Sequence, residues 1–294
     1  MLSDAISDFL TDQSVKGNSP YTLTYYESIL KRFQQFVGDV DVNTLTVQKC
    51  KEYYFFLNDD GLCSGSVQTY IRGLRAFLRW LYENDLISCN LCHKFKLPKA
   101  YRKEIDILTD DEIYTLYHSF GNDFRGVRNL CVCSLMLDSG LRLNEVLTLQ
   151  KSLFHLDERY CIVNGKCQKQ RFVPIGKVSA EYIKTYLSLA PLPSKSSKYL
   201  FTREDGAPLT RNGFKSIFRN LKITSGISRL HPHLLRHTFA TRFLENGGNI
   251  YALQNILGHT SLEMVKRYLH LSQCRLYNDF SQFSPLDNLS QKVS

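Results

Sequence analysis

Apolar side chains recur at helical spacing through much of the first hundred residues. Ser19 and Pro20 supply a cap and a first-turn proline for a segment whose apolar positions fall three or four apart, namely Tyr26, Ile29, Leu30, Phe33 and Phe36. A second segment, Ser66–Tyr82, repeats this spacing from Val67 to Leu81. These patterns predict a helical N-terminal domain over residues 1–93.

The second predicted helix carries one basic face. Arg72, Arg75 and Arg79 stand at i, i+3 and i+7, so the three side chains project from the same side. Helical charges usually form a solvated face. Every charge on this helix is positive, however, and this favours a surface that contacts phosphates.

A basic, proline-containing stretch follows, and we expect a linker over residues 94–104. Residues 94–103 read KFKLPKAYRK, and Pro98 favours extended backbone at the residue before it. Such a run is either simply solvated or follows a nucleic-acid backbone. The candidate DNA contacts in it are Lys96, Lys99, Arg102 and Lys103.

Residues 105–294 combine helical patterns with one short β pattern. Helices are predicted from a cap at Thr109 and over Phe124–Leu137, Ala180–Leu189, Arg211–Leu221, Leu234–Asn246 and Ile250–Leu257. Tyr160–Ile175 has two β-prone runs around a Gly/Lys/Gln turn, which predicts a hairpin with a basic tip. The fold class expected is therefore mainly α with a small antiparallel β-sheet (α+β).

Composition and charge indicate an ordinary core-forming protein with a polyanionic partner. Of the 294 residues 43% are hydrophobic and 22% charged, and the formal net charge is +9. The excess is uneven: residues 1–103 hold 13 basic and 11 acidic residues, and residues 104–294 hold 24 and 17. The acidic N-terminus and the lack of a long apolar run predict a cytoplasmic protein without membrane contact.

Nine cysteines invite a cofactor interpretation that the sequence supports poorly. Cys89, Cys92 and His93 match the C-x-x-C-H pattern of covalent haem attachment, but that attachment belongs to exported proteins. A zinc site would need a second ligand pair at suitable spacing, and none follows. We expect the cysteines to be buried small apolar side chains, and we expect neither a cofactor nor a metal.

Residues 231–237, HPHLLRH, concentrate three histidines and one arginine. His233 and His237 lie four apart and could bind zinc, but Leu234 stands where a metalloprotease needs its glutamate. The pattern fits an anion site better. Pro232 predicts a helix start whose free N–H groups face an anion, and His233 and Arg236 share one helix face.

Two further segments hold chemistry of the same kind. Residues 139–149, SGLRLNEVLTL, place Arg142 one turn before Glu145, either as a pair that orients the guanidinium or as an ordinary surface ion pair. Residues 257–270, LGHTSLEMVKRYLH, place His259 after a glycine and Tyr268 nine residues later.

Together these segments resemble the tyrosine recombinase (phage integrase) family over essentially the whole C-terminal part. The resemblance implies catalytic roles for Arg142, Lys166, His233, Arg236, His259 and Tyr268. Cys167 stands where a second glycine is common in the family, so Lys169 is the alternative lysine and a further candidate DNA contact. Residues 1–93 resemble the family's helical core-binding domain and residues 105–294 its catalytic domain. This arrangement is nearest to the simple two-domain Xer or transposon recombinases.

The resemblance implies a reaction at a DNA phosphodiester. Tyr268 would attack the phosphorus and form a 3′-phosphotyrosyl bond, while Arg142 and Arg236 hold the non-bridging oxygens. Lys166 would protonate the leaving 5′-oxygen, and the two histidines would position the phosphate and accept the phenolic proton. Neither ATP nor a metal is implied.

The resemblance also implies double-stranded DNA as partner and a tetramer assembled on paired sites. Leu276, Phe280 and Phe283 form a C-terminal helical stripe, which either packs on its own domain or docks on a neighbouring protomer. The sequence leaves open the DNA target, whether Tyr268 acts in cis or in trans, and a second recombinase or accessory factor. Two alternatives are a type IB topoisomerase-like nicking-closing enzyme and a non-cutting DNA-binding protein on the same scaffold.

Overall fold

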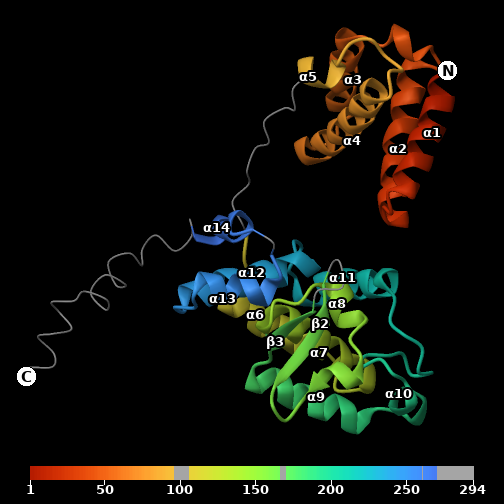
Figure 1. Cartoon of the computed structure of the whole chain (residues 1–294). Helices are drawn as coiled ribbons and strands as arrows, with labels where there is room; N and C mark the ends of the chain where they lie inside the picture. The colour runs from red at the N-terminus through yellow and green to blue at the C-terminus, as the bar shows by residue number, and fades with distance from the viewer. Residues whose placement is uncertain (96–105, 166–169, 260, 270–294) are drawn as a thin grey trace, which may run out of the picture. The chain divides into compact units, whose positions relative to one another are not determined.

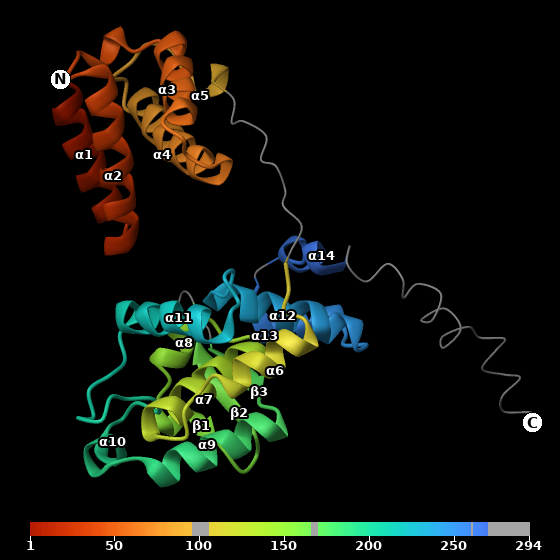
Figure 2. The same ribbon diagram turned by 180° about the vertical axis from the view of Figure 1, so that it is seen from behind.

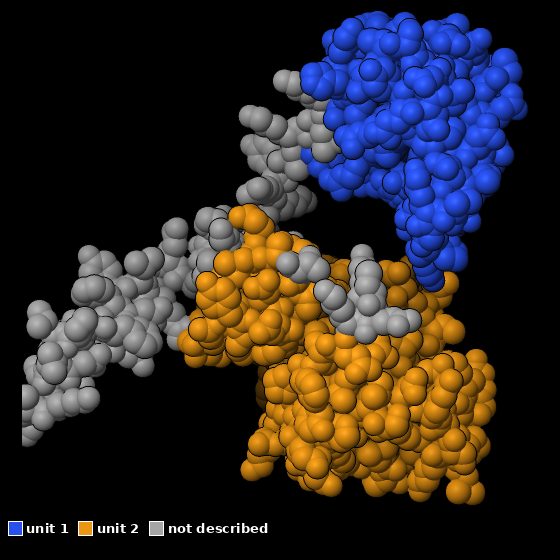
Figure 3. Space-filling view, viewed as in Figure 1, with its two compact units in different colours: residues 1–103 blue, residues 104–294 orange. Residues whose placement is uncertain are grey.

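The computed structural model describes residues 1–95, 106–165, 170–259 and 261–269, without the side chains of residues 266, 267 and 269. The chain divides into two compact units, residues 1–103 and residues 104–294, which are coloured separately in Figure 3. Each unit has its own hydrophobic core.

The first unit is helical. Its elements are α1 (Leu2–Val15), α2 (Pro20–Val37), the short 3-10 helix η1 (Val42–Thr44), α3 (Val47–Asp59), α4 (Ser64–Glu83) and α5 (Leu91–Lys94). Ser19 caps α2 by accepting from the backbone N–H of Thr22, and Pro20 occupies the first turn, as the sequence predicts. Figures 1 and 2 show α1, α2 and α4 packed side by side.

Aromatic rings fill the centre of this first core. Phe9 of α1 contacts Tyr26, Phe77 and Trp80 edge to face, with ring centroids 5.1, 5.4 and 5.6 Å away. The indole N–H of Trp80 donates to Asp12 at 2.8 Å. The apolar face of α4 is therefore fixed against α1, which leaves Arg72 and Arg79 exposed on the opposite side.

The second unit has a three-stranded antiparallel sheet among helices. Its strands are β1 (Phe154–His155), β2 (Tyr160–Asn164) and β3 (Gln170–Pro174), in the order β1-β2-β3, and Cys161 of β2 lies opposite Val173 of β3. Its helices are α6 (Asp110–His118), α7 (Phe124–Asp138), α8 (Leu143–Leu147), η2 (Lys151–Leu153), α9 (Lys177–Leu189), α10 (Leu192–Ser196), α11 (Arg211–Ser225), α12 (Pro232–Glu245), α13 (Ile250–Leu257) and α14 (Glu263–Leu269). The predicted fold class is confirmed.

Helix α7 is the centre of the second unit. It packs against α9 on one side and α12 on the other, and α13 lies beside both α12 and β3 (Figures 1 and 2). Its apolar length explains this position, because residues from Val127 to Met136 are buried around most of the helix. The described residues that the sequence singled out for catalysis lie after α7, in the first turns of α12, after α13 and on α14.

The described cysteines are free thiols with different surroundings. Burial raises the pKa of Cys50 and of Cys161 to about 12, so neither thiol is reactive at neutral pH. The expectation of burial is wrong for Cys63, which is exposed at the start of α4, and holds only in part for Cys89, which is half-buried. The buried set is Cys50, Cys92, Cys131, Cys133 and Cys161.

Some elements differ from the sequence-based expectation. The helix predicted over Leu234–Asn246 begins at Pro232, and the one predicted over Ser66–Tyr82 begins at Ser64. The short elements α8, α10 and β1 had no pattern long enough to indicate them. Within the described residues, no helix combines the length and apolar character needed to cross a bilayer.

Candidate active site

Arg142 is positioned by the turn that follows α7. Gly140 adopts φ +63°, and a Cβ at this position would collide with the ring of Phe239, so only glycine fits the turn. Arg142 then caps α8. Glu145, one turn on, accepts from the backbone N–H of Arg142 at 2.8 Å and from its Nη1 at 2.9 Å. The Arg142 side chain remains 38% exposed, so part of its guanidinium faces solvent.

Glu145 binds a second arginine that the sequence reasoning missed. Arg171 of β3 donates from Nη1 and Nη2 to the two carboxylate oxygens at 3.0 and 2.8 Å. Burial alone would raise the pKa of Glu145, but the hydrogen bonds and charge of Arg171, with those of Arg142, hold it below its usual value. Glu145 is therefore ionised and shared by two guanidiniums.

Arg236 lies one turn into α12 and is buried, with 4% of its surface exposed. It donates to the carbonyl of Gly140 and, at 2.8 Å, to the carbonyl of Leu257. Its Nη2 also lies 3.1 Å from Nε2 of His259. Burial and the charge of Arg142 lower its pKa to about 10, so the guanidinium stays protonated at neutral pH.

His233 lies in the first turn of α12, after the N-cap His231 and Pro232. Its pKa is lowered by burial of the ring and then by the nearby charges of His231, Arg236 and Arg142. The imidazole is consequently neutral at pH 7 and able to accept a proton.

His259 follows the glycine that ends α13. Gly258 adopts φ +62°, the left-handed conformation typical of a helix C-cap, and a Cβ there would lie 3.0 Å from Cδ of Arg171. The backbone N–H of His259 donates to the carbonyl of Gln254 at 3.1 Å. The turn therefore directs the His259 ring back toward Arg236 of α12.

Tyr268 of α14 is buried, with 2% of its surface exposed. Its phenol oxygen lies 2.8 Å from Nδ1 of His237, and the ring packs in a small cluster with apolar residues of α12 and α13. The sequence reasoning considered His237 only as a zinc ligand, and missed it as the partner of the phenol. Tyr268 is nonetheless near enough to Arg236 for the two to influence each other electrostatically.

Five of the six residues implied by the resemblance are described, and they gather around the N-terminal half of α12. Charge and hydrogen-bond contacts connect Arg236 with Arg142, His233, His259 and Tyr268. The sixth, Lys166, lies outside the described residues, as do Lys169, Lys96, Lys99, Arg102 and Lys103.

The basic face predicted on α4 exposes fewer arginines than the spacing of Arg72, Arg75 and Arg79 indicates. Arg72 and Arg79 are exposed, whereas Arg75 is half-buried. The first and last of these arginines therefore remain the best placed of the three for a phosphate contact.

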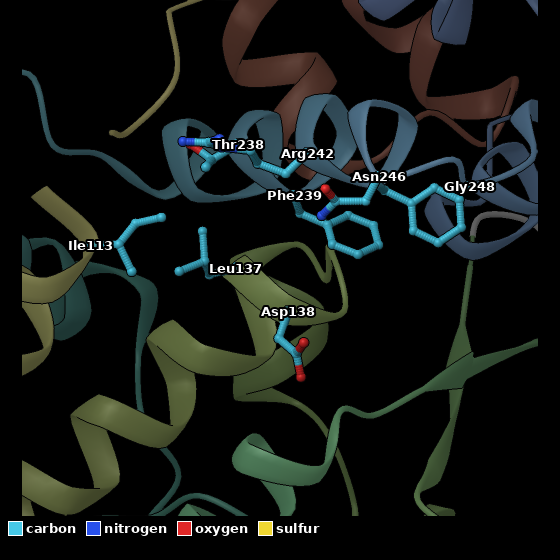
Figure 4. Close-up of a pocket in the computed structure, with 9 residues that line it drawn as sticks. Ile113, Leu137, Asp138, Thr238, Phe239, Arg242, Asn246 and Gly248 are labelled. Atoms are coloured by element: carbon cyan, nitrogen blue, oxygen red, sulfur yellow. The ribbon is translucent and has the colours of Figure 1, made fainter. Parts of the chain in front are cut away.

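A pocket of about 420 Å³ opens between α6, α7 and α12 (Figure 4). Its walls include Ile113, Leu137, Phe239 and Arg242. None of the described residues implied in catalysis lines this pocket, so it is separate from the candidate active site. Within the part of the chain that the structure describes, no three His, Cys, Asp or Glu side chains are grouped to hold a metal ion.

Comparisons with known proteins identify the family of this chain. A model of the phage integrase family matches residues 106–275, and a model of the phage integrase SAM-like domain matches residues 1–97. The tyrosine recombinase XerD of Oceanobacillus iheyensis is 32% identical over 296 residues, covering 97% of this chain and 99% of that protein. The tyrosine recombinase XerC of Lacticaseibacillus casei is 29% identical, covering 92% and 94%.

A similar structure is that of the Tn1549 transposon integrase in complex with transposon right end DNA. It superimposes with a TM-score of 0.79 at 19% identity, and the alignment covers 95% of this chain and 99% of the integrase chain. The similarity extends over both units and shows a shared fold.

Proposed function

This chain belongs to the phage integrase family of tyrosine recombinases, and we propose that it cleaves and rejoins DNA at specific sites with Tyr268 as nucleophile. The observation that carries the proposal is the contact between Arg236 and His259, 3.1 Å apart, beside Arg142 and His233. Two cations and two imidazoles in one place form a suitable site for the charged phosphate of a DNA backbone.

The arginines hold and stabilise the phosphate. Arg236 is fixed by two backbone carbonyls, and Arg142 by Glu145, so both cations are oriented before DNA binds. In the five-coordinate transition state the non-bridging oxygens gain negative charge. Guanidiniums already in position stabilise that charge without reorganising.

The histidines supply proton transfer and orientation. His233 is neutral at pH 7 because its pKa is lowered, and it accepts the phenolic proton as the bond from Tyr268 to phosphorus forms. His259 shares a hydrogen bond with Arg236 and orients the phosphate from the other side. As the bond from phosphorus to the 5′-oxygen breaks, Lys166 donates a proton to that oxygen.

Tyr268 has to leave its buried position before it reacts. Its phenol contacts His237, and with 2% of its surface exposed it is closed to a DNA phosphate in this conformation. DNA binding and assembly therefore withdraw Tyr268 from His237 and present it to a phosphate, in its own subunit or in an adjoining one.

The covalent intermediate keeps the free energy of the phosphodiester. A 5′-hydroxyl from a partner strand reverses the attack and joins new DNA, so the reaction needs no ATP. The two arginines provide the positive charge that phosphoryl transfer requires, and no step in the proposal uses a metal ion.

The proposed partner is double-stranded DNA. The Tn1549 integrase and the XerH recombinase have both been solved in complexes with DNA, and this chain carries a net charge of +9. Arg72 and Arg79 of α4 and the basic linker are the proposed contacts to the DNA backbone.

We place the reaction in a tetramer on two paired sites, with the C-terminal segment exchanged between protomers. Leu276, Phe280 and Phe283 stand at i, i+4 and i+7 in the sequence of that segment, which lies outside the described residues. Sedimentation of the protein with and without paired sites measures this step independently of the chemistry.

Covalent capture on a nicked suicide duplex tests the function. The wild-type chain is expected to form an adduct that survives denaturing electrophoresis, whereas Tyr268→Phe is expected to bind the duplex and form none. Tyr114→Phe changes an exposed tyrosine of α6 and is the matched control, with wild-type adduct yield. An adduct in Tyr268→Phe would move the nucleophile to another residue.

Two marked sites in one reaction test strand exchange. A recombinase yields products with exchanged flanks. A nicking-closing enzyme would only relax each duplex, and a non-cutting binding protein would leave both unchanged, so either result would contradict the proposal.

A further inference from the structure

We infer that Arg171 is a positioning residue, which fixes Arg142 and its helix α8 relative to the end of α13 in the phosphate-binding site. The inference rests on the proposed function of that site. Arg171 is the second residue of β3, which follows β2 in the chain and pairs with it antiparallel. It is outside the set of six catalytic residues, and its side chain is 12% exposed.

Three donors of one guanidinium tie Arg171 to two different elements. Nη1 and Nη2 bind the carboxylate of Glu145 on α8, and Nε donates to the carbonyl of Ile256 at 2.8 Å. Glu145 in turn holds the backbone and side chain of Arg142. Arg171 therefore connects the Arg142 side of the site with the end of α13.

The last carbonyls of α13 have no partners within the helix and need donors from elsewhere. Arg171 satisfies Ile256, and Arg236 satisfies Leu257 at 2.8 Å. Two cations at a helix C-terminus also interact favourably with its dipole. The chain then turns at Gly258, which leaves room for the Arg171 side chain, and places His259.

Arg171 also determines how closely Glu145 pairs with the guanidinium of Arg142. The carboxylate is buried and ionised, so it requires compensating donors. With Arg171 in place, the Arg142 side chain donates to Glu145 through Nη1 at 2.9 Å, and its guanidinium stays partly exposed. Without Arg171, the carboxylate would draw Arg142 into a closer pair and away from the phosphate.

A lysine at position 171 would keep the charge and lose the geometry. Its ammonium is a point charge and cannot span both oxygens of Glu145 while also reaching the carbonyl of Ile256. Arg171→Lys therefore separates charge compensation from positioning. The matched control is Arg128→Lys, which changes another buried arginine that donates to a carbonyl, that of Thr202, at 3.0 Å.

The test is single-turnover cleavage of a suicide duplex with either a normal phosphate or a methylphosphonate at the scissile position. A displaced Arg142 is expected to slow Arg171→Lys about a hundredfold on phosphate, since small misplacements cost that much. The methylphosphonate lacks the charge that Arg142 stabilises, so the loss there is expected to shrink to less than about tenfold. Arg128→Lys is expected to lose thermal stability while cleaving both substrates at wild-type rates.

Two results would overturn the inference. One is cleavage by Arg171→Lys within about twofold of the wild-type rate, and the other is an equal loss on both substrates, which would reduce Arg171 to a stabiliser of the fold. Failure of the wild-type chain to form any adduct would instead contradict the proposed function.

Glu145→Gln gives a second test if Arg171→Lys folds poorly. The amide keeps the shape of the side chain. Like Arg171→Lys, the variant is expected to lose less of its cleavage rate on methylphosphonate than on phosphate. The double variant Glu145→Gln with Arg171→Lys is expected to be no slower than the slower single variant, because both changes break one connection. Additive losses would mean that the two residues act separately.

Discussion

The residues proposed to bind the phosphate and the residue proposed to attack it are attached to the fold in different ways. Arg236 is buried and donates to the backbone carbonyls of Gly140 and Leu257, and Arg142 is held by Glu145. Tyr268 lies on α14, and its phenol shares a hydrogen bond with His237 of α12. A binding site gains from rigid groups that need no rearrangement, whereas the nucleophile has to travel. The comparison separates a fixed side of the active site from a movable one.

The largest expected effect comes from the fixed side. Arg236→Lys is expected to slow covalent adduct formation by about a thousandfold, because an ammonium cannot replace a planar fork that is held by two carbonyls. Arg242→Lys changes a half-buried arginine of the same helix that pairs with Asp110 and lies outside the candidate active site, and it is expected to cleave normally. The rate of adduct formation is measured on a suicide duplex. A rate near that of the wild-type chain would show that phosphate binding does not require the fixed guanidinium of Arg236.

Gly258→Ala tests the turn that places His259. The alanine would have to adopt the left-handed backbone conformation, and we expect this to lower the stability by about 1 kcal/mol. Its Cβ would also press on the Arg171 side chain, and we expect the cleavage rate to fall about tenfold. Gly226→Ala is the matched control, because Gly226 is also left-handed at a helix end but has open space around it. It is expected to lose stability in thermal unfolding and to keep its cleavage rate. Equal cleavage losses in both variants would contradict a special role for the contact with Arg171.

The movable side is tested by His237→Ala. The hydrogen bond to Tyr268 contributes about 1 kcal/mol, so its removal is expected to raise the exposed population of the tyrosine about fivefold. Nitration of Tyr268 by tetranitromethane, followed by mass spectrometry, measures this exposure. Nitration of the exposed Tyr251 is the internal control and is expected to stay constant. An unchanged nitration rate at Tyr268 would mean that packing alone retains it.

The smallest effect at neutral pH concerns His233. Because its pKa in the folded chain lies below the ordinary value of 6.5, the ring is neutral at pH 7 and becomes protonated only in more acidic solution. The unfolded chain binds this proton first, so stability is expected to fall as the pH drops below about 6.5. The cleavage rate should fall at more acidic pH, as the ring protonates in the folded chain, since a protonated ring cannot accept the phenolic proton. His233→Gln should remove this acidic limb from the pH profile, and a limb that persists would assign it to another group.

Sequence patterns identified the residue types of the site but not all of its connections. Arg142, His233, Arg236, His259 and Tyr268 were each visible because a short local motif surrounds them. Their roles stay predictions, as does the role of Lys166. Arg171 was missed because its bond to Glu145 spans 26 residues, and nothing in a strand pattern says which charge lies opposite. His237 was seen in the motif but assigned a rival role, since its partner lies 31 residues away.

The sequence likewise predicted the longer elements of the fold but not the short ones. The longer helices and the hairpin follow from periodic apolar positions. The short helix α8 has only five residues, and its position depends on the glycine turn before it and on the shared carboxylate that it carries. Such an element is determined by its surroundings, which a local pattern does not contain.

The double support at the end of α13 affects which substitutions the turn tolerates. Two arginines from other elements and one glycine fix this turn from inside the domain, so substitutions on its outer surface leave it in place. The position of His259 therefore depends on contacts inside the domain and is insensitive to changes on the outer face of the turn.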